Sequence, residues 1–113
     1  MKLVFEKREE LTFNVESFVK ENYFDNETTN SEITKAVSSF FDGLDDEYYY
    51  SNNKNELKEL VCNSILDYLK NNVIEYDAKK LWEELLDNDE CYAVPNSSKR
   101  RIMLNWLENK ENN

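Results

Sequence analysis

The chain of 113 residues contains one glycine and one proline, so it holds few of the residues that break helices. Apolar side chains recur at helical spacing over long segments of the chain. The clearest helix is predicted over 33–44, where Ile33, Val37, Phe41 and Leu44 share one face. Thr29 and Glu32 have the spacing of a capping box before it. Gly43 lies near its end, where a left-handed residue would close the helix.

Three more segments show the same helical pattern. Asn53 marks the start of a second helix, whose apolar face runs from Leu57 to Leu69. A third helix is expected over 78–88 after Asp77, which is a good N-cap residue. A fourth follows Pro95 and runs from about Ser98 to Glu108. Loops are therefore expected at 25–29, 45–53, 72–77 and 88–97.

The first 24 residues permit two interpretations. Val15, Phe18 and Val19 fit a helix that begins after Asn14. Before it, apolar residues alternate in the manner of two strands around a turn at 7–10, although this stretch also contains good helix formers. These residues are Leu3, Phe5, Leu11 and Phe13. The expected fold is a single all-α domain over 1–113, a compact bundle of four or five helices. The alternative is an α+β fold with a short N-terminal β-hairpin.

The charge balance limits the possible functions. Twenty-four acidic residues against fourteen basic ones give a net charge of −10, which disfavours direct binding to nucleic acid or to anionic membranes. The absence of histidine removes the commonest general base and a common zinc ligand, and one glycine cannot build a phosphate-binding loop. We therefore expect no enzymatic activity, no catalytic residues, no cofactor and no metal.

The two cysteines and the lack of long apolar runs indicate a cytoplasmic protein. Cys62 and Cys91 have no CxxC spacing, which favours a reducing compartment. No apolar stretch approaches the roughly 20 residues that span a bilayer. The apolar run at the N-terminus is also too short for the core of a signal peptide.

An acidic segment followed by tyrosines is the best candidate for a partner-binding surface. Residues 1–53 hold twelve acidic and five basic residues, so the first half carries most of the negative charge. Carboxylates at Asp42, Asp45, Asp46 and Glu47 are expected to steer a basic partner into place. The following Tyr48, Tyr49 and Tyr50 cannot all point into a core, and tyrosine is common at binding hot spots. A second acidic cluster, over 83–90, lacks the glycine and the final glutamate of a calcium loop.

Lys99, Arg100 and Arg101 form the one basic cluster. They lie at the start of the last predicted helix, as in a DNA-recognition helix. However, the interval after the preceding helix is longer than the turn of a helix-turn-helix. Pairing with acidic residues of the same chain is the expectation for these cations.

The predicted function is that of a non-catalytic, acidic protein-binding inhibitor. Its partner is expected to be a basic protein that handles nucleic acid, such as a nuclease. The high content of Asn, Lys, Glu and Tyr is typical of AT-rich bacteria and their phages, which favours a phage counter-defence protein, anti-CRISPR or anti-restriction. A net charge of −10 equals that of about five base pairs, so only partial DNA mimicry is expected. A small DNA-binding transcriptional regulator and a toxin-neutralising immunity protein are the alternatives.

Overall fold

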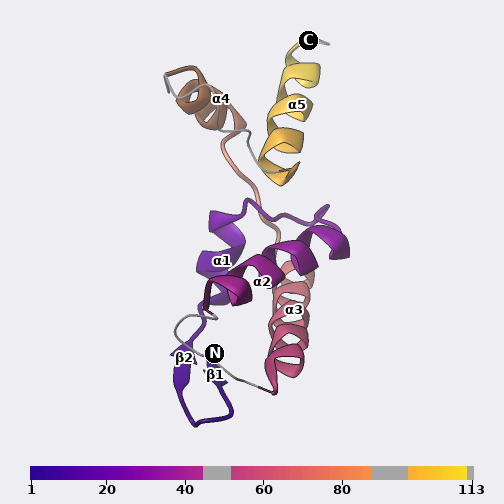
Figure 1. Cartoon of the computed structure of the whole chain (residues 1–113). Coiled ribbons are helices and arrows are strands. Elements are labelled where there is room, and N and C mark those ends of the chain that lie inside the picture. The colour runs from indigo at the N-terminus through magenta and orange to yellow at the C-terminus, as the bar shows by residue number, and fades with distance from the viewer. Residues whose placement is uncertain (45–51, 88–96, 112–113) are drawn as a thin grey trace.

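The structure is a computed structural model that describes residues 1–44, 52–87 and 97–111. Its described part consists of a two-stranded sheet followed by five helices (Figure 1). The strands are β1 (Lys2–Val4) and β2 (Glu10–Thr12), and the helices are α1 (Val15–Glu21), α2 (Asn30–Leu44), α3 (Lys54–Asn71), α4 (Ala78–Asp87) and α5 (Ser97–Glu111). The mainly helical fold is confirmed, and the N-terminal hairpin agrees with the alternative.

The hairpin forms because its alternating apolar residues face the helices. The two strands are antiparallel, with Leu3 opposite Leu11, and Leu3 is fully buried. The N–H of Arg8 donates to the carbonyl of Phe5 at 2.8 Å, and the N–H of Phe5 donates to the carbonyl of Glu9 at 2.9 Å. The turn therefore lies over 5–9, and Arg8 adopts a left-handed conformation with φ of 63°.

Three predicted N-caps are present. Side-chain oxygens of Asn14, Thr29 and Asp77 each accept a hydrogen bond from the backbone N–H three residues further on, at 3.0, 3.2 and 3.1 Å. These bonds satisfy N–H groups that have no partner inside the helix. Local sequence signals therefore fixed the starts of α1, α2 and α4.

Two predicted helix signals have other roles in the structure. Asn53 precedes α3, but its side chain makes no capping bond and donates instead to the carbonyl of Val4 at 3.0 Å. Gly43 has no positive φ and lies inside α2, so it does not close the helix in a left-handed conformation. The Asn53 side chain thus bonds the hairpin through its Nδ2 donor, while its oxygen makes no capping bond.

The main hydrophobic core lies between the hairpin, α1, α2 and α3. The rings of Phe13, Phe18 and Phe40 meet there with centroids 5.1 to 5.8 Å apart. Full burial of one large apolar side chain contributes about 1.5–3 kcal/mol. The fully buried side chains of this core include Leu3, Val19, Ile33, Val37, Phe41, Val61 and Ile65.

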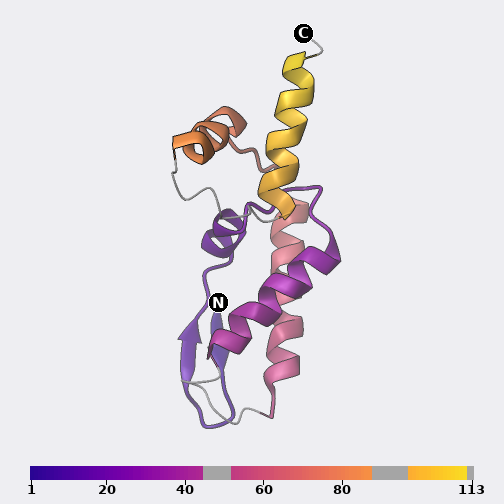
Figure 2. The ribbon, with the colours of Figure 1, turned by 45° about the horizontal axis from the view of Figure 1, so that its top comes forward.

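Helices α4 and α5 pack on each other at the end of the molecule opposite the hairpin (Figures 1 and 2). Leu81 of α4 and Met103 of α5 are buried, but they are not part of the main core. The molecule measures 56 × 34 × 20 Å and has a radius of gyration of 16.5 Å, against roughly 13 Å for a compact 100-residue domain. The molecule is therefore elongated. The α4–α5 pair is joined to the main core by residues 72–77 and by contacts of the start of α5.

Candidate protein-binding site

The predicted partner-binding segment begins in the last turn of α2. The Asp42 side chain is 68% exposed, and its Oδ1 lies 3.4 Å from Nζ of Lys54. Beyond the segment, the backbone and side-chain N–H groups of Asn52 donate to the Glu6 carboxylate, both at 2.9 Å. The chain after the segment is thus held at the hairpin. The other predicted members lie outside the described residues: Asp45, Asp46, Glu47, Tyr48, Tyr49 and Tyr50.

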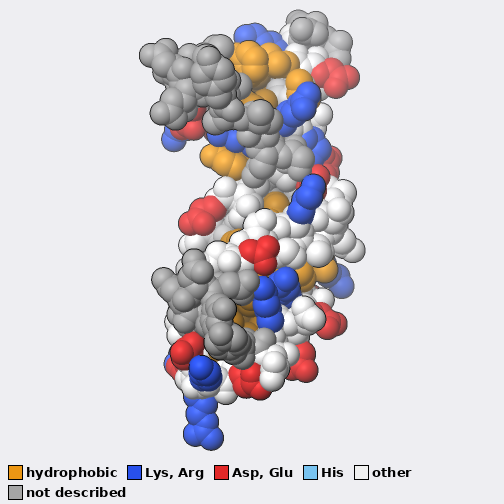
Figure 3. Space-filling model, in the orientation of Figure 1, with side chains coloured by type: hydrophobic (Ala, Val, Ile, Leu, Met, Phe, Trp, Pro, Cys, Tyr) orange, Lys and Arg blue, Asp and Glu red, His pale blue; other side chains and the backbone are white. Residues whose placement is uncertain are grey.

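Acidic and basic side chains are mixed over the face of the molecule seen in Figure 3. All fourteen basic residues belong to the described part of the chain. In contrast, segments 45–51 and 88–96 contain five acidic residues and no basic one. Half of the net charge of −10 therefore belongs to these two segments, and an acidic face at Asp42–Glu47 stays a prediction.

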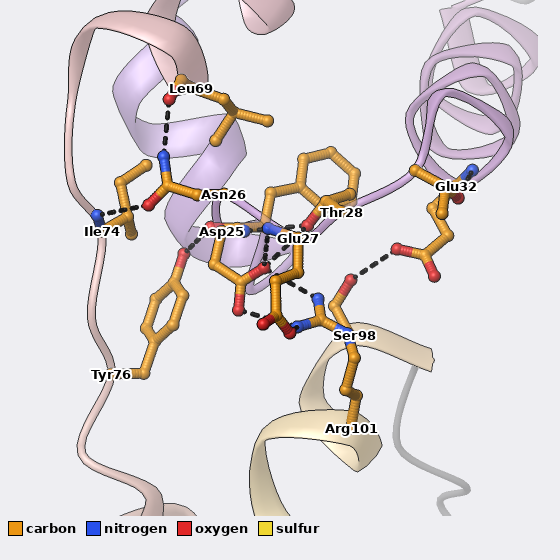
Figure 4. A network of polar contacts seen from close by, with 12 residues as sticks. Asp25, Asn26, Glu27, Thr28, Glu32, Leu69, Ile74, Tyr76, Ser98 and Arg101 are labelled. Atoms are coloured by element: carbon orange, nitrogen blue, oxygen red, sulfur yellow. Dashed lines mark hydrogen bonds and ion pairs between the residues drawn. The ribbon is translucent and has the colours of Figure 1, made fainter. Parts of the chain in front are cut away.

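Arg101 and Lys99 of the basic cluster at the start of α5 contact residues of the same chain, whereas Arg100 is exposed. The Arg101 guanidinium donates to both carboxylate oxygens of Asp25, from Nη1 at 3.0 Å and from Nη2 at 2.8 Å. Nη1 also donates to Oε2 of Glu27 at 3.0 Å (Figure 4). Nζ of Lys99 lies 5.0 Å from the centroid of the Tyr23 ring, in a cation–π position. The prediction of pairing within the chain is confirmed for Arg101.

Asp25 organises the loop that receives Arg101. Its side chain is 15% exposed, and Oδ1 accepts a hydrogen bond from the N–H of Glu27 at 2.9 Å. The N–H of Asp25 donates in turn to Oγ1 of Thr28 at 2.8 Å. Burial raises the pKa of the Asp25 carboxyl, but the hydrogen bonds from Arg101 and Glu27 and the charge of Arg101 lower it by more. The net pKa is below the ordinary value, so Asp25 is ionised at neutral pH.

Asn26 fixes the end of α3 and the start of the linker at residues 72–77. Its Nδ2 donates to the carbonyl of Leu69 at 2.6 Å and to the carbonyl of Asn72 at 2.7 Å. Its Oδ1 accepts from the N–H of Ile74 at 3.1 Å (Figure 4). One amide side chain therefore satisfies three backbone groups where the helix ends.

Tyr76 attaches the far end of the linker to α1 and to the chain just after it. Its hydroxyl lies 2.6 Å from the carbonyl of Phe24 and 3.2 Å from the carbonyl of Val19, so its one proton is shared between two acceptors. Burial, with a smaller effect of the Asp25 charge, raises the pKa of Tyr76 to about 12. The neutral phenol is the form that this site favours.

Tyr23 ends α1 in a conformation that favours glycine. Its φ is 54°, and the N–H groups of Tyr23 and the next residue donate to helix carbonyls at 3.2 and 2.9 Å, as in a Schellman motif. A non-glycine residue in this conformation costs about 1–2 kcal/mol. The ring contacts Tyr76, with centroids 5.3 Å apart, and lies under Lys99. These contacts give the tyrosine side chain a structural role that glycine could not fill.

Ser98 joins the start of α5 to the start of α2. Its side chain is almost fully buried, and its hydroxyl donates to Oε2 of Glu32 at 3.1 Å. In a capping box this carboxylate would bond back to the backbone N–H of Thr29. The Glu32 side chain here contacts α5, so the pattern that predicts a helix start also supplies a tertiary contact.

A groove of about 490 Å³ lies between α5 and the chain at linker residues 74–76 and Ala78 of α4, and we call it the α5 groove. Apolar side chains from both walls line it: Ile74, Tyr76, Ile102 and Trp106. The carboxylates of Asp25, Glu27 and Glu75 also line it, together with Arg101. Asn105 and Asn109 complete the α5 wall. The lining of the groove is thus mixed, with apolar side chains beside polar ones, and its charged residues are mainly acidic.

Sequence analysis placed Asp25, Asn26 and Tyr76 only in loops. The spacing of Asp25 and Thr28 is typical of side chains that hydrogen-bond the local backbone, which is a readable signal for a tight turn. No comparable signal joins Asp25 to Arg101, which lies 76 residues away. The choice of that partner among fourteen basic residues depends on the packing of α5.

No family model matches the chain, and neither a curated protein nor a solved structure is significantly similar to it. Across residues 1–44, 52–87 and 97–111, no group of three or more Cys, Asp or Glu side chains is placed to hold a metal ion. In those same ranges, no helix combines the length and apolar character needed to cross a membrane.

Proposed function

We propose that the chain is a non-catalytic, acidic protein-binding inhibitor that docks onto a basic, nucleic-acid-handling protein. The contacts that Arg101 and Lys99, two of the three residues of the basic cluster, make within the chain carry this proposal. Arg101 is engaged by Asp25 and Glu27, and Lys99 lies over Tyr23. A chain with a net charge of −10, in which Lys99 and Arg101 contact its own fold, favours encounter with cations over encounter with nucleic acid.

The docking surface in this proposal begins at Asp42 and continues through the segment up to Tyr50. Exposure of the Asp42 carboxylate at the end of α2 supports this choice. In the proposed mode, the carboxylates steer association and replace some phosphates of a duplex, while a tyrosine anchors the contact. Cytoplasmic action as a phage counter-defence protein, against a CRISPR or restriction nuclease, is the setting that the composition favours.

The proposal is tested by capture followed by an inhibition assay. The protein is immobilised, a bacterial lysate is applied at low salt, and bound proteins are eluted at about 0.5 M salt, where surface charges are screened. The captured protein is then purified, and its binding to labelled duplex DNA is measured with and without the chain. We expect the chain to displace the DNA. A captured protein that binds DNA equally well in its presence would contradict inhibition.

Charge reversal tests the docking surface. Replacing Asp42, Asp45, Asp46 and Glu47 with lysine should slow association with the captured partner at least tenfold and flatten its dependence on salt. The matched control reverses four exposed carboxylates elsewhere, which gives the same change in net charge: Glu21, Glu59, Asp67 and Glu108. Equal slowing by both variants would assign the effect to net charge and remove the special role of this segment.

One observation keeps the DNA-binding regulator as a second candidate, because Arg100 of the basic cluster is exposed. A gel-shift with random duplex DNA at low salt separates the two functions. We expect no shifted band. A band that disappears in an Arg100→Ala variant would favour the regulator. An immunity protein differs from the first proposal only in its partner, so the identity of the captured protein, a toxin or a nucleic-acid-handling enzyme, decides between them.

A further inference from the structure

We propose that the α5 groove binds a short, extended, basic segment of a protein partner, in which lysine or arginine alternates with aliphatic residues. This inference rests on the proposed function, because it takes the partner to be basic. It assigns a second contact surface whose lining residues do not belong to the segment Asp42–Tyr50. Charge, aromatic placement and backbone conformation support it independently.

The charges around the groove favour a cation. Asp25, Glu27 and Glu75 line the groove, and Arg101 is the single basic residue among its lining residues. Its guanidinium is already bonded to Asp25 and Glu27. Glu75 is exposed and has no ion-pair partner within the described ranges 1–44, 52–87 and 97–111. An incoming cation can therefore pair with Glu75 without breaking an existing pair.

The aromatic side of the groove already holds a cation. Nζ of Lys110 lies 5.1 Å from the centroid of the half-buried Trp106 ring, which is cation–π distance. Lys110 is exposed and lies in the last turn of α5, so the lysine side chain of a partner could take its place over the ring. Ile74 and Ile102 supply apolar surface beside it for an aliphatic side chain.

The linker wall favours an extended ligand. Asn72, where the linker begins, has φ of −134° and ψ of 138°, which are values typical of a β-strand. Among the described residues, no backbone–backbone hydrogen bond involves residues 73–76, and Val73 is 87% exposed. The N–H of Ile74 is used by Asn26, but the backbone groups of Val73 and Glu75 can pair with an added strand.

Nuclear magnetic resonance with the full-length chain locates the binding site. The ¹⁵N-labelled protein is titrated at low salt with the blocked peptide Lys-Val-Arg-Val-Lys, and separately with Glu-Val-Glu-Val-Glu. We expect the basic peptide to shift amide resonances of residues 73–78 and 102–109. The acidic peptide should leave them unchanged. In a Trp82→Phe background, the remaining Trp106 fluorescence should change on addition of the basic peptide alone.

A matched pair of charge reversals tests the role of the groove carboxylate. Glu75→Lys should weaken binding of the basic peptide at least tenfold. Glu59→Lys changes the net charge equally on the exposed surface of α3 and should leave binding within about twofold. Trp106→Leu should also weaken binding. Circular dichroism checks that each variant is folded, and because Glu75 is exposed, its variant keeps the test decisive if Trp106→Leu unfolds.

Four results would overturn the inference. Equal weakening by Glu75→Lys and Glu59→Lys would mean that net charge alone attracts the peptide. Shifts confined to residues 42–52 would place the basic ligand on the other surface, so the groove would be wrong while the proposed function stood. If the basic peptide does not bind, the groove is excluded as its site. The proposed function is then judged separately, by the identity and inhibition of the captured partner. Shifts of 102–109 that depend on protein concentration without peptide would indicate a second copy as the occupant.

Discussion

Replacing Arg101 with leucine should uncouple the α4–α5 pair from the main core. Helices α4 and α5 pack on each other. Their side-chain hydrogen bonds to the main body come from the start of α5. Arg101 makes three of the hydrogen bonds there, two to Asp25 and one to Glu27. Its loss leaves the Asp25 carboxylate without its cation in a site where the side chain is 15% exposed.

The free-energy cost of Arg101→Leu follows from the burial of the two charged side chains. Exposed ion pairs contribute about 0–1 kcal/mol, whereas removing one partner of a fully buried pair costs about 3–5 kcal/mol. Arg101 and Asp25 have side chains 25% and 15% exposed, so they lie between these limits. Glu27 is 70% exposed, so its bond adds little. We expect a cost of about 2 kcal/mol, which equals roughly a thirtyfold change in the equilibrium between the docked and undocked pair.

The two tryptophans provide the assay, since Trp82 lies in α4 and Trp106 in α5. Urea unfolding is followed by tryptophan fluorescence, which reports the α4–α5 pair, and by far-ultraviolet circular dichroism, which reports all helices. In the Arg101→Leu variant, the fluorescence transition should move to lower urea and separate from the dichroism transition. In the wild-type protein we expect the two transitions to lie closer together.

A double-mutant cycle with Asp25→Asn measures the coupling itself. The Glu16–Lys20 pair on α1 is the control: its N–O distance is shorter, 2.7 Å, but its side chains are 57% and 62% exposed. We expect coupling for the buried pair and none that can be measured for the exposed pair. Unchanged transitions in Arg101→Leu, or equal coupling in the two pairs, would refute the reasoning from burial.

Three further predictions concern the rest of the fold. Ile65→Ala should lower the free energy of unfolding by about 3 kcal/mol, whereas Leu60→Ala, at a position 47% exposed on the same helix, should cost less than about 1 kcal/mol by urea denaturation. Arg8→Gly should raise the melting temperature, with a gain of about 0.5 kcal/mol, because it removes a left-handed arginine; a lower melting temperature would contradict this. The pKa of the Tyr76 phenol should be about 12, so its stabilising effect is complete below about pH 10 and is lost as the pH rises through this folded-state pKa. Absorbance titration against Tyr76→Phe measures this, and a value near 10 would contradict it.

The candidate site was only partly predictable. Exposure of Asp42 agrees with its predicted place on a surface, while residues 45–50 lie outside the described part. Sequence analysis expected the basic cluster to pair within the chain, and Arg101 does so. It did not identify Asp25 as the partner or find the α5 groove. Both depend on bringing loop 25–29, the linker and α5 together, and no local pattern encodes that arrangement.

The amino-acid sequence by itself determined the helices and most of their ends. Hydrogen bonds inside a helix and at its N-cap join residues three or four positions apart, so the spacing of apolar residues and the caps at Asn14 and Asp77 were sufficient. Tertiary structure decided between alternatives that the local sequence signals left open. The N-terminus became a hairpin because Leu3 and Phe13 are buried against the helices, although its sequence also suits a helix. The position of the α4–α5 pair was decided likewise, because Asp25 and Arg101 form their ion pair only where loop 25–29 and α5 meet, and partial burial strengthens the attraction between them.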